Sequence, residues 1–377
     1  MKSGFLVLAI LSLSTVYAQS DSTKFGFLPA AGYTSDLGLI GGGVVNRYRY
    51  SEGYRPYRDM QMASVLVTTR GFFSLSMTHE RTSRSTRMSL KSIRSQFMGY
   101  ANRTMEYTWF GVGPDSEFDA GDYESGVNYF ESMSAGVIYR GRVPLYRTGY
   151  PGAQLDGLLI GQIAYDHPMN ADVAKAFWQD RPVGSEGGWS TVLGVGLQWE
   201  NRDNEAAPIR GNRGFLEIKT APKWVPDSYP FFLLNAEASQ YVPVRIGHLF
   251  VLAGRVGMQH ASGDVPYWFM PSLGSDLNVR GFPVNRLRGD GALWYNSEIR
   301  TWVYENRNEA IKVGLHLFRD GGGVTVGHRY REIPDDLMHT WGLGFALSMF
   351  TPDFIVRGDL GMGDEMSRFY MGIGYTF

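Results

Sequence analysis

The chain has 377 residues, of which 14% are aromatic and 47 are glycine, and its formal net charge is −1. A charge so close to zero gives no reason to expect a nucleic-acid partner, because binding to a phosphate backbone relies on an excess of Lys and Arg. Cysteine is absent, which excludes disulfides, thiolate metal ligands and thiol nucleophiles.

The chain begins with a segment typical of a secretory signal peptide. Lys2 gives it a positive start, residues 5–13 form an apolar core, and residues 16–18 form a cleavage site. An uncleaved anchor is the alternative, but the apolar run is shorter than the roughly 20 residues that a membrane-spanning helix needs. We therefore expect cleavage to remove residues 1–18, and residues 19–37 to form a short segment that enters the next domain.

From residue 38 onward, apolar residues alternate with glycine and small polar residues. Between residues 340 and 350 one face carries Trp341, Leu343, Phe345, Leu347 and Met349. A soluble sandwich would carry more Lys and Glu on its outer face. A membrane barrel needs only one apolar face on each strand, the face toward lipid. The pattern predicts an all-β fold, a transmembrane antiparallel β-barrel over residues 38–377.

The alternation predicts sixteen strands, an even number as in bacterial outer-membrane barrels. In chain order they cover 38–50, 60–69, 72–81, 87–94, 97–108, 126–139, 156–166, 190–201, 213–222, 231–243, 248–259, 291–303, 311–320, 339–349, 353–360 and 367–377. The early boundaries leave a count of fourteen open. Short turns alternate with long connections such as 167–188 and 260–290, which indicates short periplasmic turns and long external loops.

Aromatic residues mark one face of the last predicted strand, which carries Phe369, Met371, Ile373, Tyr375 and Phe377. A closing strand with a lipid-facing aromatic residue at its last position resembles the signal by which outer-membrane barrels are recognised for assembly. A plain C-terminal edge strand is the alternative.

Three motifs follow one another in the last third of the chain. They contain Val279, Arg280, Gly281 and Phe282, then Glu298 and Arg300, then Phe318, Asp320 and Gly322. In this order and spacing they resemble the barrel of the BamA/TamA outer-membrane assembly and translocation superfamily, also called the bacterial surface antigen family. Weaker matches at 33–41, 109–113 and 199–214 extend the resemblance over nearly the whole expected mature chain.

The alternation also places Glu298 and Asp320 on the inner face of two neighbouring strands, since the opposite face of each strand is largely aliphatic and would face lipid. A planar guanidinium suits one or two carboxylates. In the family that the motifs resemble, a long loop folds back into the barrel and its arginine contacts these acids. The resemblance therefore implies that Arg280 is the loop cation, with Gly281 allowing a close backbone approach. Ordinary solvated charges in the lumen are the alternative.

The resemblance implies a non-enzymatic protein of the bacterial outer membrane that acts in protein assembly, translocation or envelope biogenesis. No cofactor is expected, and no histidine pair has the spacing of a metal site. In the family, function is linked to the seam between the first and last strands, because an exposed strand edge can template an incoming strand. We expect this seam to join residues 37–48 to residues 370–377.

The expected partners are the lipid bilayer and, during biogenesis, the barrel-assembly machinery. The periplasmic repeats of the family are missing ahead of the predicted barrel, so a separate periplasmic or lipoprotein partner, or an accessory role, is the expectation. A passive pore is the alternative function, because a barrel of this size can enclose an aqueous channel.

Overall fold

The computed structural model describes residues 22–52, 54, 57–83, 93–148, 153–205, 207–223, 229–306, 311–333, 337–349 and 355–377. The expected signal peptide, residues 1–18, lies outside the described residues. Within them, no helix is long and apolar enough to cross a membrane.

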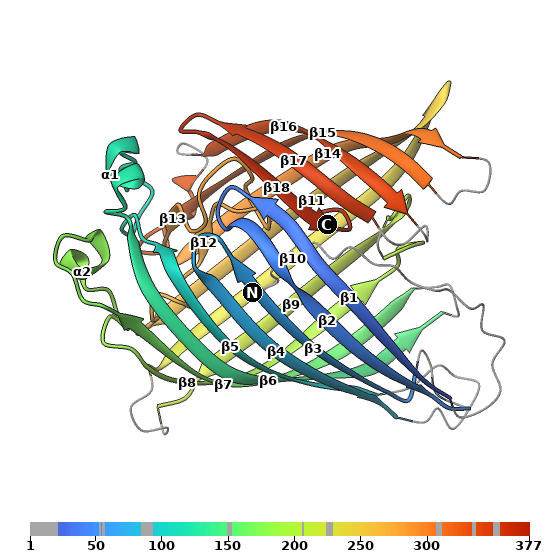
Figure 1. The fold of residues 1–377 in the computed structure, drawn as a ribbon, viewed down its shortest axis with the longest axis horizontal. Coiled ribbons are helices and arrows are strands. Elements are labelled where there is room, and N and C mark those ends of the chain that lie inside the picture. The colour runs from blue at the N-terminus through green and yellow to red at the C-terminus, as the bar shows by residue number, and fades with distance from the viewer. Residues whose placement is uncertain are drawn as a thin grey trace.

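Within the described residues, sixteen antiparallel strands close into a barrel, which Figure 1 shows from the side. They are β1 (Ser22–Thr34), β2 (Gly38–Tyr50), β3 (Asp59–Thr68), β4 (Phe72–Thr82), β5 (Arg94–Thr108), β6 (Tyr129–Arg147), β7 (Gln154–Met169), β8 (Gly188–Glu200), β9 (Gly211–Ala221), β10 (Phe231–Ile246), β11 (His248–Gly263), β14 (Gly291–Glu305), β15 (Ile311–Thr325), β16 (Met338–Met349), β17 (Ile355–Gly363) and β18 (Ser367–Ile373). The connections contain two short strands, β12 (Ser272–Leu273) and β13 (Leu287–Arg288), and two short helices, α1 (Ala120–Ser125) and α2 (Ala176–Asp180). The predicted fold class is confirmed.

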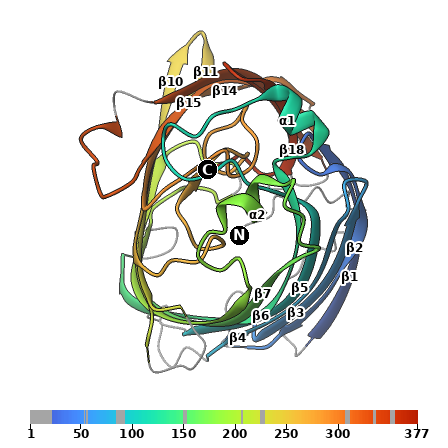
Figure 2. The ribbon, with the colours of Figure 1, turned by 90° about the vertical axis from the view of Figure 1, so that its left-hand side faces the viewer.

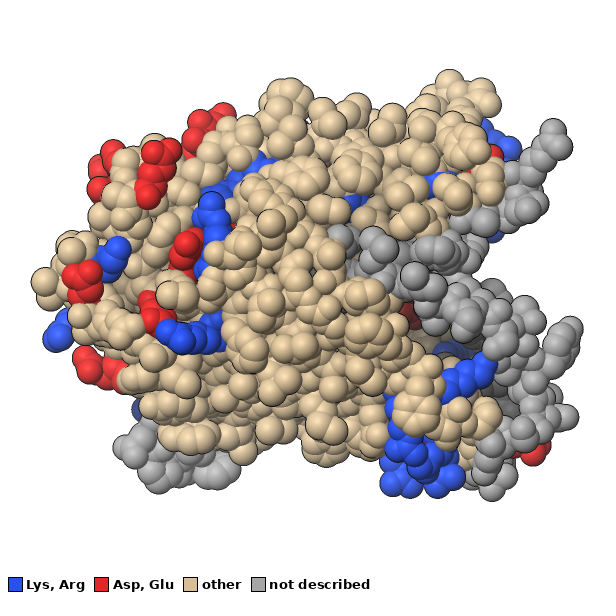
Figure 3. Space-filling view, in the orientation of Figure 1, with Lys and Arg blue, Asp and Glu red and all other residues tan. Residues whose placement is uncertain are grey.

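The two faces of the wall differ in polarity as predicted. Leu317, Trp341 and Leu343 point outward and are 49–62% exposed, whereas the alternate residues His316 and Phe318 are buried inside. On the face shown in Figure 3, Lys, Arg, Asp and Glu gather toward the two ends and leave the middle free of charge. A band of this kind suits the hydrocarbon layer of a membrane.

The barrel begins earlier than the sequence predicted. Residues 19–37 were expected to lie outside the wall, but β1 pairs with β2 along its whole length, from Ser22 opposite Tyr50 to Thr34 opposite Gly38. Pro29 interrupts the apolar pattern of this strand, so the alternation alone did not reveal it. Residues 87–92 of the predicted strand 87–94 lie outside the described residues, and Arg94 is the first residue of β5.

The long connections gather at one end of the barrel. Figures 1 and 2 show α1, α2 and the long loop of residues 264–290 at this end, with the loop turning into the interior. A buried aromatic cluster at this end contains Phe177 of α2 and Tyr267 of the long loop, together with Trp109 and Phe130. The cluster covers the mouth that the sequence assigned to the external side.

The seam between β1 and β18 is the weakest joint in the wall. Its register contains a single pair, Thr34 opposite Tyr370. Beside it, Ser35 N donates to Phe369 O at 2.8 Å, and Phe369 N donates to Ser35 Oγ at 2.9 Å. We expected residues 37–48 to form this joint. The structure assigns them to β2 and the turn before it, because β1 takes the place of the first strand.

The last residues leave the wall instead of completing it. β18 ends at Ile373, and Gly374 turns the chain with a φ of 70°, a conformation that glycine adopts without strain. The ring of Phe377 then lies inside, 4.9 Å from the guanidinium carbons of Arg255 and Arg300. The expectation that Tyr375 and Phe377 face lipid is therefore wrong.

The outward direction holds only for the earlier residues of this strand, since Ile373 remains 38% exposed and Phe369 stacks on Tyr33. Alternation continues through the sequence, but within the described residues the register of β18 with β17 ends at Ile373, and Gly374 N then donates to Ile355 O at 2.9 Å as the chain turns.

Candidate functional site

The long loop of residues 264–290 is packed against the inner wall through apolar side chains. Its core cluster contains Leu273, Val279, Phe282 and Leu287, all at most 4% exposed. Gly281 carries the loop tip onto β17: a Cβ at this position would lie 3.1 Å from Gly363 N and 2.8 Å from Thr340 Oγ1. Because its φ is also 92°, glycine is required here for both space and conformation.

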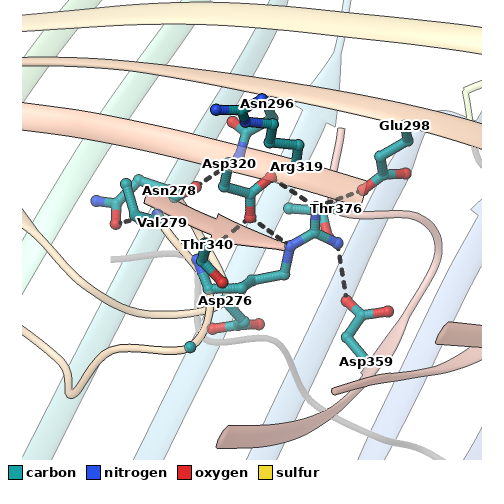
Figure 4. Close-up of polar contacts among 12 residues, drawn as sticks. Asp276, Asn278, Val279, Asn296, Glu298, Arg319, Asp320, Thr340, Asp359 and Thr376 are labelled. Atoms are coloured by element: carbon teal, nitrogen blue, oxygen red, sulfur yellow. Dashed lines mark hydrogen bonds and ion pairs between the residues drawn. The ribbon is translucent and has the colours of Figure 1, made fainter. Parts of the chain in front are cut away.

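Arg280 points from the loop tip into a group of three carboxylates, shown in Figure 4. Its Nε and Nη2 donate to the two oxygens of Asp320 at 2.7 and 2.9 Å. Nη2 also lies 2.7 Å from Glu298 Oε1, and Nη1 lies 3.2 Å from Asp359 Oδ2. The four side chains are completely buried. The structure thus brings Arg280 to both acids that the sequence assigned to it.

Four further residues belong to this cluster and were not assigned to it from the sequence. Asp359 on β17 accepts from His316 Nε2 at 2.7 Å and pairs with Arg357. Arg357 reaches back to Asp276 of the loop at 3.1 Å. Arg357 and Asp359 lie two residues apart, so they share the inner face of a strand that the sequence did predict. That charged pair was the available signal.

The C-terminal residues join the same network. Arg300 donates through Nε to Glu298 at 2.7 Å and through Nη2 to the backbone oxygen of Phe377 at 3.2 Å. Its guanidinium carbon lies 4.1 Å from the centre of the Tyr375 ring, a cation–π contact. Thr376 accepts from Arg280 at 3.5 Å, so one cluster holds both the loop tip and the end of the chain.

The remaining motif residues support Arg280 from the sides. The Phe318 ring lies flat beneath the guanidinium, with its centre 3.4 Å from the guanidinium carbon. Gly322 makes room for Leu273, whose side chain lies 2.9 Å from where a Cβ would be. The Tyr370 hydroxyl accepts from Gly281 N at 3.3 Å and donates to Phe282 O at 3.0 Å.

Buried charge of this kind is stable only when every member has a partner. Burial on its own would lower the pKa of Arg280, but Asp320 and Glu298 outweigh that effect and hold its pKa well above the ordinary value. The arginine therefore stays cationic, and the carboxylates around it are occupied by cations rather than free for proton transfer. No group of three or more metal-ligating side chains occurs among the described residues. The arrangement is suited to fixing the loop inside the barrel.

A second loop arginine fastens the loop to the rim. Arg286 pairs with Glu365 of the turn between β17 and β18, with a shortest distance of 2.6 Å. It also donates to the backbone oxygen of Ser116 at 2.8 Å. The loop is thus attached both inside the barrel and at the end where the helices lie.

Comparison with known proteins agrees with this architecture. Residues 160–377 match the family described as the Omp85 superfamily domain. Among curated proteins, none matches this chain. Several solved structures share the fold at low sequence identity, which supports the fold alone.

Three of these structures illustrate the similarity. BamA from Haemophilus ducreyi lacking POTRA domains 1–3 has 12% identity and a TM-score of 0.61, with coverage of 94% of this chain and 71% of that one. CdiB from Acinetobacter baumannii has 13% identity and a TM-score of 0.56, with coverage of 94% and 60%. CdiB from Escherichia coli has 14% identity and a TM-score of 0.57, with coverage of 96% and 64%. The chain spans less than two thirds of either CdiB.

Proposed function

The chain belongs to the Omp85 superfamily, and on that premise we propose that it is an outer-membrane barrel that assists other polypeptides in inserting into, or crossing, the outer membrane. Its fold is similar to those of BamA and CdiB. The observation that carries the proposal is the seam, where a long first strand meets a short last one with a single register pair.

The unpaired edge of β1 suits strand templating. Residues 22–33 pair with β2 on one side, and no register partner on β18 is present for them within the described residues. A strand edge with free backbone donors and acceptors attracts another strand. Phe25 and Phe27 point outward and are 75% and 65% exposed, so an added strand of alternating character would continue the apolar outer surface.

The ion-pair cluster around Arg280 supports the same function in a different way. It holds the loop within the lumen, so a polypeptide is directed to the seam and not through an open channel. In this function the barrel lies in outer-membrane lipid and is itself assembled by the barrel-assembly machinery. A separate periplasmic or lipoprotein partner delivers the polypeptide to it.

Depletion in the native host tests the proposal most directly. We expect the amounts of other outer-membrane barrels, or of secreted proteins, to fall when this protein is depleted, as measured by quantitative proteomics of isolated outer membranes. Unchanged amounts of both classes would contradict the proposal.

A seam-locking variant makes the test specific. If the register of Thr34 and Tyr370 continued, Ala31 would lie opposite Ile373. The chain has no cysteine, so the double variant Ala31→Cys, Ile373→Cys contains only the introduced thiols. We expect the oxidised variant to lose complementation of the depletion and to regain it with a reductant.

The matched control places the same bond between strands that are already paired. Val45 on β2 lies opposite Ala63 on β3, and both side chains point outward. Oxidising the variant Val45→Cys, Ala63→Cys should leave complementation intact. Loss of function in both variants would mean that cross-linking itself, and not seam closure, causes the defect.

A further inference from the structure

The end of the seam nearest the helices is held by an ion pair rather than by extended strand pairing. Arg368 of β18 lies 3.0 Å from Asp36, which belongs to the turn between β1 and β2. The two side chains are 4% and 11% exposed. No other ion pair in the described part of the chain connects β18 with β1 or with the turn that follows it.

Helix α1 holds Arg368 from the other side. Arg368 donates to the Tyr123 hydroxyl, and its guanidinium carbon lies 5.2 Å from the centre of the Tyr123 ring. Tyr123 in turn packs against Phe110 and Tyr129, with ring centres 5.8 and 5.1 Å away. The arginine is therefore placed by a packed aromatic group on an external connection, and not by the strand alone.

We propose that Arg368 is the positioning residue that keeps the seam closed, and that α1, through Tyr123, sets its place. The joint has one register pair and two hydrogen bonds between Ser35 and Phe369, so it depends on the buried pair: losing Arg368 would leave Asp36 buried without its cation. This inference rests on the proposed function, in which the seam receives incoming polypeptides. The opening itself is a property of the barrel and can be measured without any client polypeptide.

The charge around Asp36 explains why Arg368 is needed. The titratable and charged groups that face the pair from the packed elements are Asp276 of the long loop, Arg70 of the β3–β4 turn, Tyr123 of α1 and Tyr370 of β18. Burial raises the pKa of Asp36 to about 6, with Asp276 adding to the rise and Arg368 opposing it. Removing Arg368 takes away the cation that opposes this rise, so the ion pair across the joint is lost and Asp36 is left buried beside a second acidic residue.

The experiment measures the width of the seam with a pair of spin labels. Leu39 and Leu343 point outward, on β2, the second strand on one side of the seam, and on β16, the third strand on the other side. Four strand spacings separate them, roughly 19 Å when the seam is closed. Both positions are changed to cysteine in the full chain, which has no other thiol, and the labelled protein is studied in phospholipid nanodiscs at pH 8.

We expect Arg368→Gln to raise the population with longer separations at least threefold. The charge-exchanged variant Asp36→Arg, Arg368→Asp should recover most of the closed population. Arg142→Gln serves as the control, because it removes a similar ion pair, Arg142 with Asp156 at 2.6 Å, between β6 and β7. The control should not change the distance distribution. A folded Arg368→Gln barrel with unchanged distances would overturn the proposal.

A second variant keeps the proposal testable if Arg368→Gln does not fold. Arg368→Lys keeps the charge but lacks the planar group that reaches both Asp36 and the Tyr123 hydroxyl. We expect it to have a larger open population at pH 8 than the unmodified protein. A folded Arg368→Lys barrel with the distance distribution of the unmodified protein would contradict the proposal.

The role of α1 has its own test. Tyr123→Phe removes the hydroxyl that accepts from Arg368 and keeps the ring in place. We expect an open population between those of the unmodified protein and Arg368→Gln. If Tyr123→Phe behaves as the unmodified protein does, α1 does not set the position of Arg368. Unchanged distances would overturn the role of Arg368 but not the proposed function, which the depletion experiment tests separately.

Discussion

At the scale of single residues, Arg280 is fully buried among three carboxylates. Its five N–H donors face Asp320, Glu298 and Asp359, and the ring of Phe318 covers one face of the guanidinium. The planar fork matters as much as the charge, because Nε and Nη2 bind both oxygens of one carboxylate.

Arg280→Ala should destabilise the folded barrel by about 3–5 kcal/mol, because three buried carboxylates lose their common cation. Arg280→Lys should lose less, since it keeps the charge but not the fork. The measurement is the urea midpoint of unfolding in lipid. Arg210→Ala is the control: Arg210 is 77% exposed and lies 3.8 Å from Asp203, so its loss should cost no more than about 1 kcal/mol. Equal effects of the two alanine variants would contradict this account.

Asp36 predicts how stability depends on pH. Its pKa in the folded protein is about 6, above the value of 3.8 that applies in water. The folded state therefore binds the proton more tightly, so the contribution of Asp36 to stability is greatest below about pH 4 and is lost as the pH rises through 6. The free energy of unfolding, relative to that of Asp36→Asn, should decrease across this range. A difference that stays constant from pH 4 to 7 would show that Asp36 is solvated.

At the scale of elements, the strands were predictable where alternation is uninterrupted. Trp341 to Met349 alternate without a break, and the predicted strand 339–349 agrees with β16 to within one residue. β1 was missed because Pro29 and two glycines weaken its pattern, although Phe25 and Phe27 show which face meets lipid. β1 belongs to the wall because it pairs with β2, and such pairing cannot be read from the sequence of one strand alone.

The C-terminal segment shows a second limit of sequence patterns. Alternation predicts which side of a strand a residue lies on, but only while a neighbouring strand holds it. Within the described residues the register with β17 ends at Ile373, and beyond it Tyr375 and Phe377 turn inward to contact Arg300. The partners of Arg280 could be predicted in part, since Glu298 and Asp320 follow from motifs, whereas Asp359 depends on how the loop crosses to β17.

Phe377→Ala tests the inward position of the C-terminal residue. The ring is 7% exposed and contacts Arg255, Arg300 and Tyr241, so its loss should destabilise the refolded protein by about 3 kcal/mol. Phe377→Tyr should have a smaller effect. Unfolding by urea in lipid gives both values. A residue that faced lipid would instead show little change on truncation, and that outcome would contradict the inward position.

The role of Phe369, Ile373, Tyr375 and Phe377 as an assembly signal remains a separate prediction. It concerns the unfolded chain before the barrel forms, so folded contacts do not decide it. If the signal includes Phe377, Phe377→Ala should reduce the amount of protein that reaches the outer membrane of cells by several-fold. Pulse-labelling followed by membrane fractionation measures this amount. Refolding in vitro at an unchanged rate would separate a recognition defect from a folding defect.

At the scale of the whole molecule, the loop held inside the barrel separates the proposed assembly role from a passive pore. The long loop turns into the interior at the end where the aromatic cluster lies. In planar bilayers the unmodified protein should therefore show low conductance, and Arg280→Ala should raise it by releasing the loop. High and steady conductance in both proteins would favour the passive pore.

The Tyr370 hydroxyl contacts the loop tip at both Gly281 and Phe282, and in the described part of the chain the same residue makes the single register pair with β1. The loop and the seam are therefore coupled: moving the loop out of the lumen pulls directly on the residue that pairs β18 with β1. On this geometry, release of the loop and opening of the seam are a single movement. A force or ligand acting on either would be felt at the other without any relay between them.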